Sequence, residues 1–504
     1  MLSKVQSVAV WGIEGHPVSV EVDISRGIPG ISIVGLPDQA VKESKDRIKP
    51  AIKNSGFDFP QSKITINLAP ADLKKEGSCF DVPIALGILA AKQIIPVQAI
   101  DDFYFVGELA LDGSVRPVSG VLPMAIFVKS KRGKLVVPFS NALEASVVGI
   151  DVYPVGSLKE CVDFLSGKKE IHPFKCDREK LFAQYSKYEV DFREVKGQSL
   201  ARRAIEVSVS GGHNILMIGP PGAGKSMIAK RIPTIFPSLE IEEAIEITKI
   251  HSVAGTLDGG IVSVRPFRQP HHTISDIALI GGGAIPKPGE ISLAHNGVLF
   301  LDEIPEFHRD VLEALRQPME DGKVVISRAK GRIEFPSRFF LVAAMNPCPC
   351  GYYGDSRMAC RCTTAQIIKY RKKISGPLLD RIDIHIEVSA LGSKQLVSDQ
   401  ICEDSESIRK RIEKCRKIQI ERFKGTGIFC NGHMNTKQLK QFCVLDDGCK
   451  SFLQRALEQM HLSARGYDRV IKVARTIADL EESEQINLSH ISEALQYRSF
   501  DREL

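Results

Sequence analysis

The chain has 504 residues, of which 43% are hydrophobic and 25% are charged, which is the composition of a globular protein. This length exceeds one ordinary hydrophobic core, so we expect two or three domains. No apolar run is long enough to span a membrane and the N-terminus has no signal-peptide pattern, so we expect a cytoplasmic protein without a membrane partner. There the 12 cysteines would be thiols or metal ligands. The net charge of +6 permits an anionic partner without requiring one.

Residues 1–170 predict an α+β domain. Period-two alternation predicts strands at 8–11 and 18–24, and a short apolar run predicts a buried strand at 64–68. Residues 82–91 are uncharged and predict a buried helix. Strands and helices in this mixture are typical of a self-contained domain with its own core.

A stretch of this domain from Gly107 to Gly120, which reads GELALDGSVRPVSG, resembles the proteolytic domain of Lon. Lon-type proteases use a serine nucleophile and a lysine base. The nucleophile's place holds Cys79 here, and the place of the lysine, two residues past Gly120, holds Leu122. Because a leucine cannot accept a proton, we expect a Lon-like fold without the catalytic dyad or peptidase activity, and Cys79 as a core residue.

A charged, irregular linker is expected at 171–190, followed by a P-loop α/β domain at 191–390. This domain contains an octapeptide that fits G-x-x-x-x-G-K-[ST] between an apolar strand at 214–218 and a helix at 227–232. The glycines allow backbone N–H groups to approach phosphates, and the helix N-terminus adds a favourable dipole. Lys225 is expected to reach the β- and γ-phosphates of ATP, and Ser226 to ligate Mg²⁺. The loop consists of Gly219, Pro220, Pro221, Gly222, Ala223, Gly224, Lys225 and Ser226.

An acidic signal of the Walker B type follows the P-loop. Residues 297–301 predict an apolar strand that ends at Asp302 and Glu303. We expect Asp302 to hold Mg²⁺ through its water shell and Glu303 to polarise the attacking water. A third apolar strand, over 339–345, ends at Asn346, whose amide is suited to position that water.

This arrangement resembles the AAA+ ATPases, in which Asn346 takes the sensor-1 position. The resemblance continues in the segment GPLLDRID at 376–383, where Arg381 matches the arginine that acts on the γ-phosphate of the neighbouring subunit. It implies a homo-oligomeric ring, which we expect to be a hexamer. By residue type alone, Arg381 is also suited to a salt bridge with Asp380 or Asp383.

Two further segments narrow the resemblance. The sequences QPHH at 269–272 and PKPGEISLAHNG at 286–297 resemble the ATPase subunit of magnesium chelatase. A Lon-like domain fused to such an ATPase resembles the YifB/ComM family over essentially the whole chain. The histidine pair has no third ligand and is more often structural than metal-binding.

Residues 391–504 predict helices, which the family resemblance identifies as a helical lid. The same resemblance places the nucleotide-binding sensor-2 arginine at Arg465, with Arg469 as the alternative. A helix around 408–417 is rich in lysine and arginine. Such a face is usually solvated and less often a nucleic-acid surface.

Residues 323–335 predict a β-hairpin with a basic turn. Arg328, Lys330 and Arg332 lie at or beside the turn. In this branch of AAA+ proteins the hairpin lines the central pore, so the resemblance makes these residues the expected DNA contacts. The residues alone are equally compatible with a solvated edge hairpin whose cations prevent aggregation.

Four cysteines follow Asn346 as two C-x-C pairs. Four thiolates suffice for one tetrahedral Zn²⁺ site, which we expect here. The C-x-C spacing is less common than C-x-x-C, so reduced structural thiols are the alternative. The four are Cys348, Cys350, Cys360 and Cys362.

The resemblance implies an AAA+ ATPase that uses ATP and Mg²⁺ and works as a DNA motor. The motor would drive ATP-dependent branch migration or unwinding in natural transformation (competence) or recombination. The alternatives are a chelatase-like ATPase that remodels a protein partner, and an ATP-dependent protease or unfoldase. Leu122 counts against the protease. The fused Lon-like domain, which the chelatase subunit lacks, counts against the chelatase-like reading.

Overall fold

The computed structural model describes residues 1–498 apart from 187, 258–259, 284–285, 329–330, 356–357, 391–401 and 461–462. The chain forms two compact units, Met1–Ser186 with Ile241–Ser263, and Lys187–Glu240 with Val264–Leu504. Each unit has its own hydrophobic core, as expected for a chain of this length. Among the described helices, none combines the length and the apolar character needed to cross a membrane.

The first unit is built on a seven-stranded sheet of order β3-β4-β2-β1-β5-β8-β9. Its two longest strands, β1 and β2, are antiparallel, whereas β5, β8 and β9 run parallel to one another. Alternate residues of β2 are buried from Val18 to Val22, which confirms the period of two predicted for 18–24, whereas Val8 and Ala9 of β1 are both buried, so the alternation predicted at 8–11 is wrong. Strand β4 is present as predicted, but only alternate residues of it are buried. The strands are β1 (Leu2–Trp11), β2 (Glu14–Ser25), β3 (Gly30–Val34), β4 (Lys63–Ala69), β5 (Phe103–Phe105), β8 (Lys134–Pro138) and β9 (Val152–Val155).

Helix α2 (Asp81–Ala91) of this unit is buried along its whole length, as its uncharged sequence predicts. A second pair of strands, β6 (Glu108–Leu109) and β7 (Val115–Arg116), forms a small hairpin inside the Lon-like stretch. The other helices of four residues or more up to the P-loop domain are α1 (Gln39–Asn54), α3 (Val121–Ser130), α4 (Ala142–Ser146), α5 (Leu158–Leu165) and α6 (Arg178–Tyr185). Helix α6 therefore lies within the segment 171–190 that the sequence predicts to be an irregular linker.

A segment from within the expected ATPase domain folds into the first unit. Helix α9 (Ile241–Ala254) packs against α3, and the Gly120 N–H donates to the carbonyl of Ser252 over 3.1 Å. The Ser252 hydroxyl donates to the buried carboxylate of Glu144 over 2.5 Å. The expected domain 191–390 is thus interrupted by residues 241–263. Local sequence cannot reveal this, because the helix is fixed by apolar and polar contacts with residues about 100 positions earlier.

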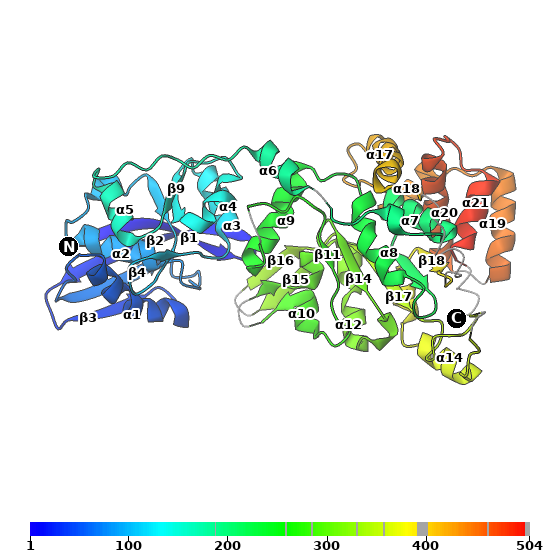
Figure 1. Cartoon of the computed structure of the whole chain (residues 1–504), viewed down its shortest axis with the longest axis horizontal. Coiled ribbons are helices and arrows are strands. Elements are labelled where there is room, and N and C mark those ends of the chain that lie inside the picture. The colour runs from blue at the N-terminus through cyan, green and yellow to red at the C-terminus, as the bar shows by residue number, and fades with distance from the viewer. Residues whose placement is uncertain are drawn as a thin grey trace. The chain divides into compact units, whose positions relative to one another are not determined.

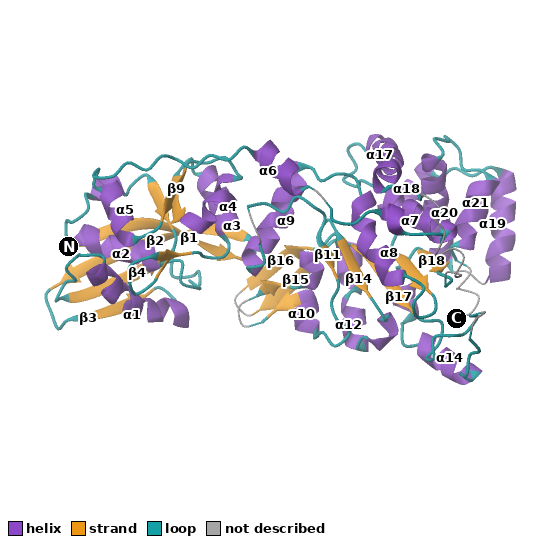
Figure 2. Ribbon diagram, in the orientation of Figure 1, coloured by secondary structure: helices purple, strands orange, loops and turns teal. Residues whose placement is uncertain are grey.

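The second unit contains a five-stranded sheet of order β11-β14-β17-β10-β18, in which all neighbours are parallel. Every residue of β10, β14 and β17 is buried, which agrees with their continuous apolar sequences. Helices flank these strands (Figure 2). The strands are β10 (Ile215–Ile218), β11 (Phe267–Arg268), β14 (Val298–Leu301), β17 (Phe340–Met345) and β18 (Ile384–Glu387).

Two helices adjoin the P-loop, α7 (Ser199–Gly211) before it and α8 (Lys225–Arg231) after it. The predicted hairpin is present as β15 (Lys323–Arg328) and β16 (Gly331–Pro336). From residue 402 to 498 the described chain is helical, as predicted, and these helices are orange to red in Figure 1. They are α17 (Ser405–Arg422), α18 (Thr436–Phe442), α19 (Asp447–Met460), α20 (Ala464–Leu480) and α21 (Leu488–Gln496).

Candidate nucleotide site

The P-loop and the two other predicted motifs meet at one edge of the parallel sheet. Strand β10 pairs with β17 so that Ile218 lies opposite Met345, and β14 pairs with the other side of β17. The residues that follow these strands, Gly219, Asp302 and Asn346, therefore leave the sheet at the same edge. This is the edge at which parallel α/β sheets bind ligands.

Two glycines of the P-loop have separable roles. A Cβ on Gly219 would lie 2.2 Å from the carbonyl oxygen of Val388, so this glycine is required for close packing against the end of β18. A Cβ on Gly222 would meet no atom within 4 Å, but its φ of 76° favours glycine. The sequence motif attributes both glycines to phosphate approach, whereas the structure gives the first a packing role as well.

The ammonium group of Lys225 lies inside the loop. Its Nζ donates to the carbonyl of Gly219 over 2.5 Å and to Oδ1 of Asn346 over 3.2 Å. Burial lowers the pKa of Lys225, and the nearby carboxylates of Asp302 and Glu303 oppose this shift. The buried cation is held by neutral oxygens, so these residues fit the phosphate groups of a nucleotide.

The predicted magnesium ligands are in contact. The Ser226 hydroxyl donates to Oδ2 of Asp302 over 2.7 Å. A hydroxyl and a carboxylate are hard oxygen ligands of the kind that Mg²⁺ prefers. The backbone N–H of Glu303 donates to Oδ1 of Asp302 over 3.0 Å. The side chain of Glu303 is exposed, and its backbone has a φ of 51°. A glutamate rarely adopts this left-handed conformation, and such residues cluster at functional sites.

Comparisons with known proteins agree with this geometry. Family models of the magnesium chelatase subunit ChlI match residues 20–141, 191–396 and, for its C-terminal part, 402–498. The competence protein ComM of Haemophilus influenzae is 45% identical over 507 residues, which cover 99% of this chain and 98% of that protein. The chain belongs to the ComM/YifB family of magnesium chelatase-like AAA+ proteins. The uncharacterized protein YifB of Escherichia coli is 42% identical over 513 residues, with the same coverage of both chains.

A weaker similarity, over about a quarter of the chain, is to a Lon protease. Lon protease 2 of Bacillus subtilis is 26% identical over 146 residues, or 27% of this chain and 26% of that protein. At the place of the Lon nucleophile, Cys79 is buried, and burial, with a smaller contribution from Asp81, raises the pKa of its thiol to about 12. Leu122, at the place of the base, is also fully buried. These two positions offer neither a thiolate nor a proton acceptor.

Asn346 is held by contacts that the sequence motifs do not reveal. Tyr370, a buried residue of α14 (Thr364–Arg371), lies beside the backbone of Asn346, and burial and the charge of Glu306 raise the pKa of this tyrosine. Gly351 lies against the P-loop, since a Cβ there would be 2.7 Å from Cδ of Pro221. No local pattern identifies either contact, because both join segments that are distant in sequence.

Arg381 lies in the loop between α15 (Gly376–Leu379) and β18. Its guanidinium donates to the carbonyl of Pro377 over 2.7 Å and forms an ion pair with Glu320 of α13 (Arg316–Asp321). Neither Asp380 nor Asp383 is its ion-pair partner among the interactions of the described residues. The side chain of Asn214, just before β10, donates to the carbonyl of Arg381 over 3.1 Å and ties this loop to the central strand.

The two candidates for the sensor-2 arginine differ in their surroundings. Arg465 lies exposed in the first turn of α20. Arg469, one turn later, donates to Oδ1 of Asp383 over 2.7 Å, and His213 contacts the other oxygen of that carboxylate at 3.3 Å. Arg469 therefore has a structural partner, which favours Arg465 for the nucleotide.

The basic hairpin is only partly described. Its strands pair from Lys323↔Pro336 to Arg328↔Gly331, and Lys330, one of the predicted DNA contacts, lies outside the described residues. For Arg328 only the backbone is described. Arg332 is exposed and forms an ion pair with Glu334 over 2.9 Å, and Lys323 at the base forms another over 2.8 Å. The same carboxylate thus holds one cation near the turn and one at the base.

The four cysteines after Asn346 come together as predicted. Their four Sγ atoms all lie within 4.8 Å of one another. The sequence alone could not decide whether two pairs ten residues apart would meet.

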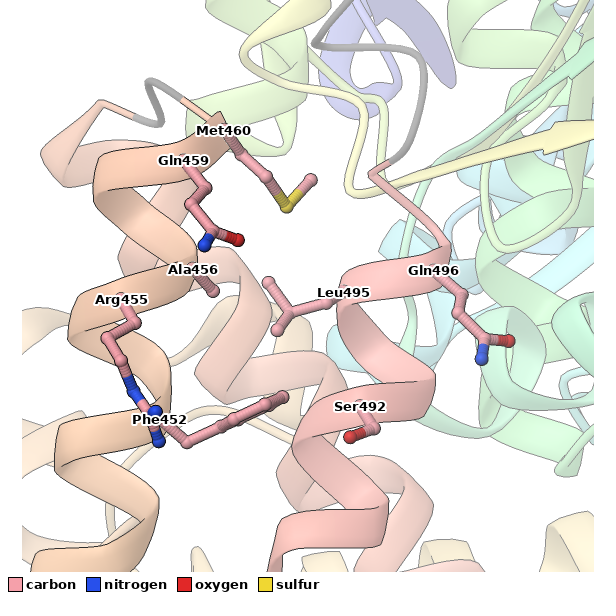
Figure 3. A pocket seen from close by; sticks show the side chains of 8 residues that line it. All are labelled: Phe452, Arg455, Ala456, Gln459, Met460, Ser492, Leu495 and Gln496. Carbon is pink, nitrogen blue, oxygen red and sulfur yellow. The ribbon is translucent and has the colours of Figure 1, made fainter.

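A groove lies between α19 and α21 in the helical region (Figure 3). It has a volume of about 450 Å³ and is lined by apolar side chains such as Phe452 and Leu495 and by neutral polar ones, with Arg455 at one side. Its lining includes none of the P-loop, Walker B or sensor residues, so it is separate from the nucleotide site.

Proposed function

We propose that this chain is an ATP-hydrolysing motor that assembles into a homo-hexameric ring and drives branch migration or unwinding of DNA. The observation that carries the ATPase part is the meeting of Lys225, Asn346, Ser226 and Asp302 at one sheet edge. A phosphate-binding lysine, a polar amide and two magnesium ligands are the parts that phosphoryl transfer to water requires.

Each residue has a defined task in this reaction. Lys225 exchanges its present carbonyl and amide partners for phosphate oxygens, which offer a charged acceptor to a buried ammonium. Mg²⁺, when bound, neutralises charge on the phosphates, and Ser226 and Asp302 hold it. The exposed carboxylate of Glu303 orients and polarises the attacking water. Asn346 fixes the position of that water through its amide.

The proposed ring rests on Arg381, which is suited to complete the nucleotide site of an adjacent subunit. A guanidinium stabilises charge on the transferred phosphoryl group, and in AAA+ rings it is supplied by the adjacent subunit. Within its own chain the guanidinium of Arg381 has Glu320 and the carbonyl of Pro377 as partners. A site completed in trans therefore suits its position, and Arg465 completes the site from the lid.

DNA is the proposed substrate for two reasons. The relative from Haemophilus influenzae carries the name competence protein and is similar over nearly its whole length. In addition, the sequence that forms the hairpin β15–β16 is basic and contains Arg328, Lys330 and Arg332. Cations that contact phosphates bind any sequence, as a motor that travels along DNA requires.

A chelatase-like motor that remodels a protein partner is the second candidate, because all three matching family models describe a magnesium chelatase subunit. The buried Cys79 and Leu122 argue against the third, an ATP-dependent protease. The two remaining candidates differ in what stimulates the ATPase.

The deciding experiment measures ATP hydrolysis and strand displacement by the full-length protein. Synthetic four-way junctions, forked duplexes, single strands, and an unfolded protein of similar charge are compared as additives, with Glu303→Gln as the control for contaminating ATPase. We expect stimulation by branched or single-stranded DNA and displacement of a labelled strand. An active ATPase that no DNA stimulates would overturn the DNA assignment and leave the chelatase-like candidate.

A further inference from the structure

We propose that Cys348, Cys350, Cys360 and Cys362 bind one Zn²⁺ ion as four thiolates, and that this ion fixes the loop that supports the P-loop and Asn346. The zinc site rests on its own geometry and does not depend on the motor activity proposed above. The site is closed, with four protein ligands, so its role is structural and not catalytic.

The distances between the sulfur atoms fit the ion. Sγ of Cys348 lies 3.3 Å from that of Cys350 and 3.7 Å from that of Cys360, and the Cys350–Cys360 separation is 3.6 Å. With Zn–S bonds of about 2.3 Å, the edge of a tetrahedron of sulfur atoms is about 3.8 Å. Cys362 completes the set within the same 4.8 Å limit. All four cysteines are free thiols.

Backbone groups around the cluster are arranged to support thiolates. The N–H of Tyr353 points to Sγ of Cys348 at 3.3 Å, and the N–H of Cys362 points to Sγ of Cys360 at 3.4 Å. Donors of this kind offset the negative charge that four thiolates retain around a divalent ion. Gly351, with φ of 86°, accepts the left-handed turn that bends the chain back between the first and second pairs.

The partial exposure of the cluster argues against the alternative that the four cysteines are ordinary thiols of a hydrophobic core. Cys348 is buried, but the other three are only partly buried and lie on a loop rather than in an apolar core. Four thiols gathered at a partly exposed site bury little apolar area, so the hydrophobic effect gives no reason for their convergence. A shared metal ion gives that reason, because its binding energy folds the loop.

The loop contacts two parts of the nucleotide site, the P-loop and the segment that follows Asn346. Gly351 lies against Pro221 of the P-loop, as the 2.7 Å approach of a Cβ to its Cδ requires. Arg371 donates to the carbonyl of Pro347 over 3.3 Å and its guanidinium lies 5.5 Å from the ring centre of Tyr353. Helix α14, which carries Arg371, begins directly after the last cysteine pair. Loss of the ion would therefore loosen the support of Asn346 and of the P-loop.

The test begins with the wild-type protein, purified without a metal-affinity step from cells grown with zinc. Elemental analysis should find about one Zn²⁺ per chain, and X-ray absorption should find four sulfur ligands at about 2.3 Å. Exchange with Co²⁺ should give the intense visible absorption of a tetrahedral tetrathiolate site. These measurements need no variant and no catalytic activity.

Variants locate the site and separate it from the motor. The double variant Cys360→Ser/Cys362→Ser should lose the zinc, whereas Cys176→Ser, the matched cysteine control outside the cluster, should retain it. Lys225→Ala should also retain the full zinc content while losing ATP hydrolysis, so the zinc proposal and the motor proposal can fail independently. A folded wild-type protein that contains no zinc, that binds iron instead, or whose four cysteines form disulfides in mass spectrometry would overturn the zinc assignment.

Discussion

Arg381 forms its ion pair with Glu320, a residue of α13, and not with either of the aspartates beside it in sequence. The side chain of Arg381 is mostly buried in this arrangement, while that of Glu320 is mostly exposed. An exposed carboxylate holds an arginine weakly, since such pairs contribute about 0–1 kcal/mol. In the proposed ring, the γ-phosphate bound by a neighbouring subunit can therefore compete for the guanidinium.

The first prediction tests this transfer to the neighbouring subunit. Arg381→Ala should reduce ATP hydrolysis by about 10³-fold or more, the effect of arginine fingers elsewhere. A mixture of inactive Arg381→Ala and inactive Lys225→Ala chains should recover part of the activity, because mixed rings contain some interfaces with both residues intact. Glu320→Gln is the control and should keep wild-type turnover. Mixed rings that form but stay inactive would show that the arginine does not act in trans.

The second prediction separates binding from hydrolysis at the P-loop. Lys225→Ala should abolish productive ATP binding, since it removes the cation that meets the phosphates. Glu303→Gln should bind ATP but hydrolyse it very slowly, since the amide cannot polarise water as a carboxylate does. Nucleotide affinity and turnover are measured on the same preparations. Wild-type turnover by Glu303→Gln would show that another group activates the water.

The third prediction distinguishes the two lid arginines. Arg465→Ala should change the free energy of unfolding by no more than about 0.5 kcal/mol, as for an exposed residue, but should reduce ATP hydrolysis. Arg469→Ala should cost about 3–5 kcal/mol, because it leaves the buried carboxylate of Asp383 without its charge partner. The free energy of unfolding, from denaturant titration, and the rate of ATP hydrolysis are measured for both variants. The opposite pattern would make Arg469 the sensor.

The fourth prediction concerns Asp383 and pH. Burial raises the pKa of this carboxyl, but the charge of Arg469 and the hydrogen bond with His213 outweigh burial and hold the pKa well below its usual range. A carboxyl whose pKa is lower in the folded than in the unfolded state stabilises the fold above the unfolded pKa, near 4, and loses this contribution as the pH falls further.

Asp383→Asn should therefore lower the free energy of unfolding by about 3–5 kcal/mol at pH 7 and by a similar amount at pH 5. The difference from wild type should shrink only below pH 4. Asp380→Asn, three residues earlier, is the matched control and should stay within about 0.5 kcal/mol at every pH. A difference that shrinks already between pH 7 and 5 would contradict the lowered pKa.

The fifth prediction concerns the hairpin. Lys330→Ala should keep the basal ATPase but lose DNA-stimulated ATPase and strand displacement. Each lost phosphate contact should lower the slope of log affinity against log salt by about 0.7–0.9. Lys323→Ala removes a cation from the base of the same hairpin and serves as the matched control. Equal junction unwinding by Lys330→Ala and wild type would favour a solvated hairpin with no role on DNA.

Much of the candidate site could be predicted because its motifs are local. The strand, glycine loop and helix around Lys225 are consecutive, and so are the apolar strand and the acidic pair at Asp302. An apolar run that ends at a glycine or a carboxylate predicts a buried strand followed by a candidate site residue, whatever position that strand takes in the sheet. Because β14, β17 and β10 are parallel neighbours in the sheet, the motifs that follow them lie together at one edge.

The predicted domain borders missed one segment, residues 241–263, which belongs to the first unit. The boundary at 191 reflects a change in composition, which is a local signal. Residues 241–263 have no such signal, and their place in the first unit depends on the bonds that Ser252 makes to Glu144 and Gly120. Such long-range polar contacts inside a core leave no periodic pattern in either segment.

Short contiguous motifs were enough to predict the chemistry of the candidate site: a lysine for phosphate, ligands for magnesium, a family resemblance and four cysteines. The partners of those groups became visible only in the folded chain. It paired Arg381 with Glu320 and Arg469 with Asp383, placed Gly351 on Pro221, and gathered the four sulfur atoms within 4.8 Å. The reason is that side-chain identity is a local property of the chain, whereas a contact depends on how distant segments pack against each other.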